Sequence, residues 1–339
     1  MRGRCAADTR GVSDYTDMMP NAAKTSRVRR APGKPAPRQI PRPKISSPWF
    51  LRTMRGVQII ELAPFKKFPW LAHGFSTRTG GASVLHSGER VLNLGFTDWD
   101  HRENVLKNRQ TFQSALGAND HTLVALKQIH SAVVRLAPEI STDLSLPSGV
   151  LAQTGDASIT NLPSLLLGIQ TADCVPIFLV DAKKRVVAAI HAGWRGTLAR
   201  IAEKAVGEMR KEFGSKPTDI LAALGPAIGD CCYQVGTELV TEFTSQFGDA
   251  EEYFDELRTG EEPNSLQWLN MMPPGHQPPP KNVRLDLRKA NRAQLLAAGL
   301  RDANIFVSDL CTACHTDLFF SYRKEAVRSG RMLSVIGIA

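Results

Sequence analysis

The 339-residue sequence has little of what marks membrane or secreted proteins. No apolar run approaches the ~18 residues that a membrane-spanning helix needs. The N-terminal region lacks the apolar core of a secretory signal. The six cysteines therefore do not indicate the disulfide framework of a secreted domain. We expect a cytoplasmic protein with reduced thiols and no membrane partner.

Net charge is nearly absent from most of the chain, although the total is +9. Residues 1–55 hold 13 Lys and Arg against 3 Asp and Glu, which leaves a net charge of −1 for all the other residues. This tail is rich in Arg, Pro, Ala and Ser and has no helical or strand period, so residues 1–55 are predicted to be disordered. Nucleic-acid binding by the body is not expected. An organellar presequence, a nucleic-acid-binding arm and a start codon placed too far upstream, with Met54 as the alternative start, stay open as alternatives for the tail.

Residues 56–339 have the pattern of one α/β (α+β) domain, with a proline-rich surface loop at about 261–281. A glycine-rich loop is expected at 79–83. Strands are predicted at 58–62, 72–76, 122–126, 132–136, 220–224, 305–307 and 334–338, and helices from Asp98 or Asp100 to Leu116, over 197–213 and over 286–298.

A β-hairpin is the most informative local prediction. Two apolar, β-branched-rich runs at 175–180 and 185–190 flank the polar segment 181–184. A turn centred on that segment places Cys174 opposite His191. Directly opposed residues of an antiparallel pair have Cβ atoms about 4.5–5.5 Å apart. A thiolate and an imidazole at these two positions can therefore share one metal ion.

His130 is the candidate third ligand, because it lies at the edge of an apolar strand beside small and polar residues. Three protein ligands with a fourth position left for water is the arrangement of catalytic zinc. The alternative is three unrelated residues at strand ends. His73 lies inside an apolar strand and is predicted to be a core histidine that bonds to the backbone.

The segment CTACH offers a rival metal site at Cys311, Cys314 and His315. Cys-x-x-Cys spacing suits a zinc knuckle, but such a site needs a second ligand pair. The adjacent Cys231 and Cys232 are not spaced for that role. Packed free thiols are therefore the prediction here, and a redox-active pair is the alternative.

Two glycine-rich loops follow strands, in TRTGGAS and LGPAIG. Such loops can present backbone N–H groups to an anion, but neither one matches a P-loop or a dinucleotide fingerprint. Arg78 and Arg195 each lie beside glycines, which favours a phosphate or carboxylate site. Tight turns and solvated arginines are the alternatives.

The motifs HGFSTRTGGAS, NLGF, KQIH, GDA, TADCVP, HAGWRGT and LGPAIGDCCYQVG occur in an order that resembles the YfiH-like family, also called laccase-domain or multicopper polyphenol oxidoreductase-like proteins. The resemblance runs from about Gln58 to Ile338. It implies a single-domain α/β fold with mixed β-sheets packed between helices. It also implies one zinc ion per chain, held by the residues that match KQIH, TADC and HAGW, which are His130, Cys174 and His191.

The resemblance further implies an enzyme of purine nucleoside chemistry that uses a nucleoside and phosphate as substrates. Phosphorolysis of adenosine, inosine and methylthioadenosine, and deamination of adenosine, are the implied reactions. A cytoplasmic peptidoglycan-precursor editing hydrolase with Cys174 as nucleophile is one alternative, and a non-enzymatic metal-stabilised binding domain is another. Laccase activity is not expected, because the chain has eight histidines and no His-x-His pair for a copper cluster.

Five further residues are candidates for roles in catalysis. Zinc lowers the pKa of a bound water toward about 7, and deamination also needs a carboxylate to carry the proton. Asp173, beside the cysteine, and Asp156, in GDA, are the candidates. Arg78, Asn93 and Arg195 are candidates for binding phosphate or stabilising the departing purine. Each of the five can instead have a structural role, as a helix cap or a loop brace.

Overall fold

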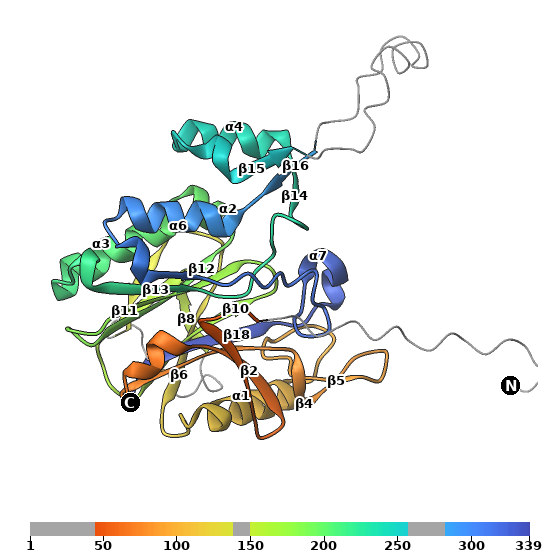
Figure 1. The fold of residues 1–339 in the computed structure, drawn as a ribbon. Coiled ribbons are helices and arrows are strands. Elements are labelled where there is room, and N and C mark those ends of the chain that lie inside the picture. The colour runs from red at the N-terminus through yellow and green to blue at the C-terminus, as the bar shows by residue number, and fades with distance from the viewer. Residues whose placement is uncertain (1–44, 138–149, 257–281) are drawn as a thin grey trace, which may run out of the picture. The chain divides into compact units, whose positions relative to one another are not determined.

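The computed structural model describes residues 45–137, 150–256 and 282–339 (Figure 1). Its largest sheet has seven strands and contains the first and the last strand of the described chain. The order is β1 (Trp49–Met54), β2 (Val57–Leu62), β3 (Leu71–Ser76), β18 (Met332–Ile338), β10 (Leu165–Thr171), β6 (Thr122–Lys127) and β8 (Val150–Thr154).

A second sheet of six strands carries the central hairpin. Its order is β17 (Ile305–Val307), β13 (Ile220–Leu224), β11 (Val175–Asp181), β12 (Val186–Ala192), β9 (Ala157–Thr160) and β7 (Val134–Leu136). Both sheets mix parallel and antiparallel pairs. In the seven-stranded sheet β10 is antiparallel to β18 and parallel to β6. In the six-stranded sheet β11 is antiparallel to β12, and β13 is parallel to β17. The predicted class of mixed sheets packed between helices is confirmed.

The alternation of side chains along β11 explains the layering. Ile177 and Leu179 lie in one core cluster with the helices α3 (Ile201–Phe213) and α6 (Leu287–Ala297), whereas Phe178 and Val180 lie in another with the seven-stranded sheet. Successive strand residues face opposite sides, so both faces of this hairpin are buried. This is why the two runs are continuously apolar.

The outer face of the seven-stranded sheet is covered by α1 (Arg102–Leu116), so the layers run helix, sheet, sheet, helix (Figure 1). Phe112 of α1 packs with Ile59 and Val335 in this third cluster. The other strands and α-helices of the described chain are smaller. They are the strands β4 (Thr79–Val84), β5 (Arg90–Val91), β14 (Gln234–Gly236), β15 (Phe254–Glu256) and β16 (Asn282–Leu285), and the helices α2 (Trp194–Leu198), α4 (Thr237–Gln246) and α7 (Tyr322–Glu325).

The predicted boundary of the tail at residue 55 is wrong. Residues 49–54 form the edge strand β1, which pairs antiparallel with β2 along its whole length. Trp49 is 4% exposed and packs edge-on against Phe75, with ring centroids 5.5 Å apart. Arg52 forms an ion pair with the buried Glu61 of β2. Residues 1–44 and the proline-rich segment 261–281 lie outside the described residues.

Two predicted elements differ in detail. The segment 197–213 is two helices, because Arg200 between α2 and α3 takes a left-handed φ of 62° that interrupts the helical path. The residues expected to form a glycine-rich loop at 79–83 form most of β4. In the described part of the chain, no helix combines the length and the hydropathy needed to cross a bilayer.

The two helix starts that depend on aspartate have different outcomes. Asp286 caps α6 as predicted, since its side chain accepts hydrogen bonds from the amides of Arg288 and Lys289. The helix α1 begins after His101 and has no side-chain cap. Asp100 instead accepts hydrogen bonds from the side chains of Ser83 and Asn93, so it braces a loop.

Candidate metal centre and its surroundings

The hairpin register differs from the prediction. Pro176, not Cys174, lies opposite His191. The turn has the four residues expected but lies one residue further along the chain, at 182–185, and Arg185 at its end has a left-handed φ of 51°. The side chain of Asp181 holds this turn by accepting hydrogen bonds from two amides of the turn, those of residues 183 and 184. The shift is two residues, so Cys174 stays on the same side of the hairpin as His191 and lies diagonally from it.

Three predicted ligands converge despite this shift. The Sγ atom of Cys174 and ring nitrogens of His130 and His191 all lie within 4.8 Å of one another. The two imidazole rings meet edge to face with centroids 4.9 Å apart. His130 is exposed, Cys174 is half-buried and His191 is buried. The group therefore has one open side.

Asp156 organises two of these three residues. It accepts hydrogen bonds from the backbone amides of Ile129, His130 and Ser131 and from the hydroxyl of Ser131. These bonds hold the turn in which His130 takes a left-handed φ of 57°. Oδ1 of Asp156 also lies 2.9 Å from Nδ1 of His191. With Nδ1 bonded to a carboxylate, Nε2 is the nitrogen of His191 left for a metal ion.

The electrostatics favour a thiolate at Cys174. Burial alone would raise the pKa of this thiol, but His191 and His130 outweigh burial and lower it to about 6. Burial would lower the pKa of His191, but the charges of Cys174 and Asp156 raise it to about 9. Burial would raise the pKa of Asp156, and hydrogen bonds from His191 and Ser131 lower it to about 2. A metal cation at this position would take the place of the imidazolium proton.

Gly193 leaves the space in which the ligands meet. A Cβ atom at this position would lie 3.0 Å from Sγ of Cys174 and 3.2 Å from Cδ2 of His130. The φ of Gly193 is −77°, which any residue can adopt. The glycine is therefore required for the space beside the ligands and not for its backbone angle.

Asp173 lies next to the cysteine and joins three loops. Its carboxylate accepts hydrogen bonds at 2.7 Å from the hydroxyl of Thr312 and from the amide of Arg323. Its carbonyl accepts from the amide of Ile228. It has a left-handed φ of 95°, which is costly for a residue other than glycine. Asp173 is thus held firmly beside Cys174, with both carboxylate oxygens already accepting hydrogen bonds.

Two residues near this centre were missed by the sequence reasoning. Burial raises the pKa of Tyr233 to about 12, and the charges of Cys174, Asp173 and Arg195 also act on its hydroxyl. The guanidinium of Arg323 lies 5.1 Å from the centre of the Tyr233 ring. Tyr233 follows a cysteine pair and Arg323 lies in a short helix, so neither local pattern indicated a site.

Arg195 is the exposed arginine of the predicted set. It follows Gly193 and Trp194, and its guanidinium lies 4.2 Å from the centre of the Trp194 ring. Its guanidinium is therefore accessible from solvent.

Arg78 and Asn93 have structural surroundings. Arg78 is 4% exposed, donates to the carbonyl of Thr316 and forms an ion pair with Glu325 at 2.7 Å. Asn93 is 0% exposed, and its amide group bonds to neighbouring loop atoms and to the backbone of Arg331. These contacts correspond to the structural role that was the alternative for Asn93, a loop brace.

A second cluster joins the two cysteine pairs, and its four thiols are free. Cys231, Cys232, Cys311 and Cys314 lie on two loops, yet their Sγ atoms are all within 4.8 Å of one another. The expectation that Cys231 and Cys232 are not spaced to join the other pair is wrong, because the chain turns sharply at this point.

His73 behaves as predicted and accepts a hydrogen bond from the amide of Leu62.

Comparison with known proteins adds a family and several relatives. The sequence model of a family described as multi-copper polyphenol oxidoreductase laccase matches residues 72–339. The chain is 34% identical over 278 residues to a Geobacillus stearothermophilus protein named purine nucleoside phosphorylase YlmD, covering 79% of this chain and 94% of that protein. It is also 36% identical over 278 residues to a protein named adenosine deaminase RL5, from an unknown prokaryotic organism. That alignment covers 82% of this chain and 98% of the other protein.

Solved structures show the same fold. The Bacillus licheniformis hypothetical protein YfiH aligns with a TM-score of 0.71 and 28% identity, over 87% of this chain and all of that one. The structure of YlmD from Geobacillus stearothermophilus aligns with a TM-score of 0.65 and 31% identity, over 85% and 97%. The expected YfiH-like architecture is therefore confirmed.

Proposed function

Because this chain belongs to the multi-copper polyphenol oxidoreductase laccase family, whose relatives at this identity are named as purine nucleoside enzymes, we propose that it is a zinc-dependent purine nucleoside phosphorylase and adenosine deaminase. The proposed reactions are phosphorolysis of adenosine, inosine and methylthioadenosine, and deamination of adenosine. The observation that supports this proposal best is the convergence of His130, Cys174 and His191 beside an open side.

Zinc is the metal that the donor set favours. Two imidazole nitrogens and one thiolate are typical zinc ligands, and three protein ligands leave a fourth position open. The space kept by Gly193 beside Sγ of Cys174 fits this purpose. A zinc ion supplies a Lewis acid and lowers the pKa of water in its open position.

The surrounding residues have distinct proposed roles. Asp156 is a positioning residue, because its carboxylate holds His191 and the turn of His130 and is 2% exposed. Asp173 holds the loops beside Cys174. Tyr233 keeps its proton at neutral pH and can donate a hydrogen bond to the substrate, while Arg195 provides the positive charge that a phosphate needs.

The family description contains the word laccase, but the ligand set does not suit that chemistry. Among the described residues, only two groups of three or more side chains could hold a metal, and one of these consists of cysteines. The other contains just two histidines, His130 and His191. Coupled copper centres need many more imidazoles. We therefore propose that phenol oxidation is absent or incidental.

The chain is proposed to act in the cytoplasm. Five cysteines of the described residues are free, which is compatible with a reducing compartment.

Product analysis tests the proposed reactions. Purified protein is incubated with adenosine, with and without inorganic phosphate, and the products are separated by chromatography. We expect adenine and ribose-1-phosphate when phosphate is present, and inosine from deamination in either condition. A chelator should abolish both activities and zinc should restore them, without a need for copper. Copper-dependent oxidation of phenols with no change in any nucleoside would contradict the proposal.

A second candidate function is supported by one specific arrangement. Cys174, His191 and Asp156 form a thiol, imidazole and carboxylate series, and the pKa of Cys174 is lowered. This series suits a cysteine nucleophile, as in a hydrolase acting on peptidoglycan precursors. Iodoacetamide separates the two functions. A nucleophile is alkylated and inactivated in the protein as purified, whereas a zinc ligand is protected until the metal is removed.

A further inference from the structure

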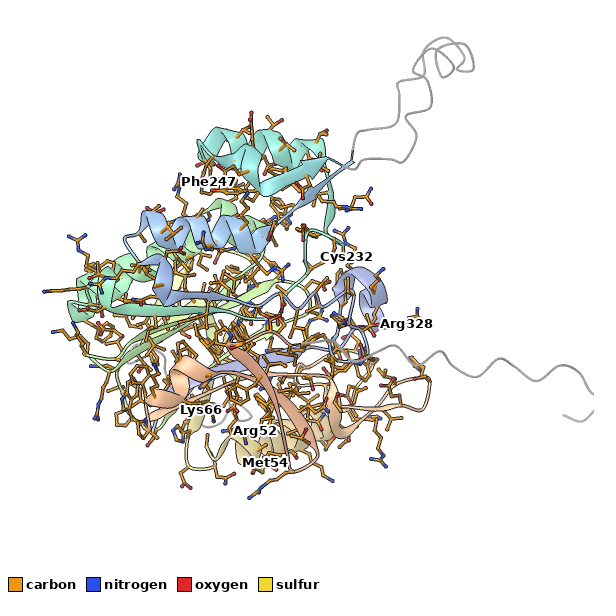
Figure 2. The ribbon with its side chains drawn as sticks, viewed as in Figure 1. Arg52, Met54, Lys66, Cys232, Phe247 and Arg328 are labelled. Carbon is orange, nitrogen blue, oxygen red and sulfur yellow. The ribbon has the colours of Figure 1, made fainter. Side chains whose placement is uncertain are left out.

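The four-cysteine cluster lies outside the centre described above and is built by two loops. Cys231 and Cys232 lie between β13 and β14, and Cys311 and Cys314 lie between β17 and α7. Figure 2 shows Cys232 on the stretch that leads into β14. The Sγ atom of Cys314 is 3.5 Å from that of Cys231 and 3.4 Å from that of Cys232. All four Sγ atoms lie within 4.8 Å of one another.

Backbone pairing brings the two loops together. The strands β13 and β17 are parallel neighbours, and an isolated bridge joins Ala227 to Cys311 just beyond their ends. The amide of Thr312 donates to the carbonyl of Ala227. The chain then turns at Gly229, whose carbonyl accepts hydrogen bonds from the amides of Cys232 and Tyr233. This turn directs both adjacent cysteines toward the Cys-x-x-Cys loop.

The cluster has the surroundings that a bound cation with thiolate ligands requires. Sγ of Cys311 accepts a hydrogen bond from the backbone amide of Gly229 at 3.2 Å. Such N–H donors stabilise ligand thiolates and fix their direction. The buried Arg288 lies alongside, since its Nη2 atom and Sγ of Cys231 both lie about 3 Å from the position of a Cβ atom on Gly229. Its positive charge offsets part of the negative charge of four thiolates.

The sulfur spacing matches a tetrahedral ion. With Zn–S bonds of about 2.3 Å, the sulfur atoms of a tetrahedral site are about 3.8 Å apart. The measured separations of 3.4 and 3.5 Å and the common limit of 4.8 Å bracket this value. Cys231 and Cys314 are exposed, so an ion can enter from solvent.

We propose that Cys231, Cys232, Cys311 and Cys314 bind one structural zinc ion. The four thiols lose their protons to solvent on binding, and no electron is transferred. A closed set of four thiolates leaves no position for substrate, which is the arrangement of a structural site. The chain then holds two zinc ions, one at each centre.

This second ion would stabilise the loops that contact Asp173, the neighbour of Cys174. Thr312 lies within the Cys-x-x-Cys loop and donates to the carboxylate of Asp173 at 2.7 Å. Ile228 precedes the turn at Gly229 and donates to the carbonyl of Asp173 at 2.9 Å. Tyr233 directly follows Cys232. Loss of the ion should therefore loosen the residues beside the first centre as well as lower the melting temperature.

Metal stoichiometry of the full-length protein tests the proposal. After zinc loading and dialysis, elemental analysis should give two zinc ions per chain for the natural sequence. It should give one for Cys314→Ser and one for Cys174→Ala. One ion in the natural sequence that persists in Cys314→Ser would overturn the proposal.

Cobalt substitution gives a spectroscopic readout of the cluster while its four cysteines are all present. The Cys174→Ala protein loaded with Co²⁺ should show an intense thiolate-to-cobalt charge-transfer band from four sulfur ligands. Cys232→Ser added to Cys174→Ala should weaken that band. Absence of the band in folded Cys174→Ala would contradict the proposal. So would a count of two fewer reactive thiols in the unfolded natural protein, because it would indicate a disulfide within the cluster.

Discussion

Nδ1 of His191 lies 2.9 Å from Oδ1 of Asp156, and the same carboxylate accepts hydrogen bonds from the amides of the turn that carries His130. One buried aspartate therefore sets the position of two of the three proposed metal ligands. Such outer partners commonly contribute about 10- to 100-fold to metal affinity or activity. This relationship makes Asp156 the most sensitive position that does not itself bind the metal.

Replacing Asp156 tests that relationship. Asp156→Asn places an amide NH₂ or a neutral oxygen where a carboxylate now accepts four bonds from residues 129–131. We expect zinc affinity and adenosine turnover to fall about 10- to 100-fold. The matched control is Asp181→Asn, because Asp181 is also buried but accepts only from the hairpin turn, and asparagine serves such turns equally well. Equal zinc affinities of the two variants would contradict the assigned role.

Glycine at position 193 is expected to support zinc binding because it has no side chain that would crowd the ligands. Gly193→Ala puts a methyl group 3.0 Å from Sγ of Cys174 and 3.2 Å from the His130 ring, which must displace a ligand. We expect at least about a 10-fold loss of zinc affinity with little change in folding. Gly207→Ala is the control, since a Cβ atom there has nothing within 4 Å. That exposed helical change should raise stability by up to about 1 kcal/mol. Titration with a zinc-binding dye measures the first effect and thermal unfolding the second.

A buried neutral histidine should make the fold sensitive to acid. Burial lowers the pKa of His73 to about 4, with Glu61, Lys66 and Arg52 as the charged groups around it. Its stabilising effect is complete above the unfolded pKa of about 6.5 and is lost as pH falls toward 4, by about 3 kcal/mol in total. Arg52 and Lys66, both labelled in Figure 2, form ion pairs with Glu61 of β2.

The variant His73→Gln isolates this effect, because a glutamine oxygen can still accept from the Leu62 amide but does not titrate. Denaturant unfolding at pH 7 and pH 5 should show a smaller loss of unfolding free energy for His73→Gln than for the natural protein. Glu61 adds its own loss at lower pH, since burial would raise its pKa but hydrogen bonds from Arg52 and Lys66 hold it below 4.5. Identical pH dependence in both proteins would show that His73 does not control it.

Truncation should separate the tail from the edge strand. Removal of residues 1–44 is expected to leave thermal unfolding and turnover unchanged. Removal of residues 1–54 takes away β1 and exposes the core around Trp49 and the buried Glu61. Loss of a buried tryptophan alone costs about 3–5 kcal/mol. The longer truncation should therefore lower the melting temperature strongly, and equal melting temperatures of the two truncated proteins would contradict this account.

The outcome at individual residues shows what sequence could and could not provide. Residue types and motif order identified His130, Cys174 and His191, because metal chemistry restricts which side chains serve as ligands. The same reasoning missed the register by two residues, since the four-residue turn lies one residue further along the chain and the left-handed Arg185 at its end leaves no pattern in the sequence. The paired cysteines at 231 and 232 looked unsuitable because a tertiary turn, not their spacing, brings them to Cys314.

The strand β1 shows a different limit. Its sequence, WFLRTM, directly follows a long proline-rich and basic stretch. The composition of the whole segment therefore indicated disorder and hid the six residues of the strand. Only the pairing with β2 and the packing of Trp49 make it a strand. Asn93 and Arg78 were named for their chemistry, yet their burial commits them to loop contacts. Burial of polar groups is set by tertiary structure and could not be predicted from local sequence.

Anomalous X-ray diffraction at the zinc edge from crystals of the zinc-loaded protein tests the central claim most directly. The account predicts a strong peak at bonding distance from Sγ of Cys174, Nε2 of His191 and a ring nitrogen of His130. A further peak within the four-cysteine cluster is also expected. A protein that turns over adenosine in a zinc-dependent manner but shows no peak between His130, Cys174 and His191 would contradict the claim that these residues hold the catalytic metal.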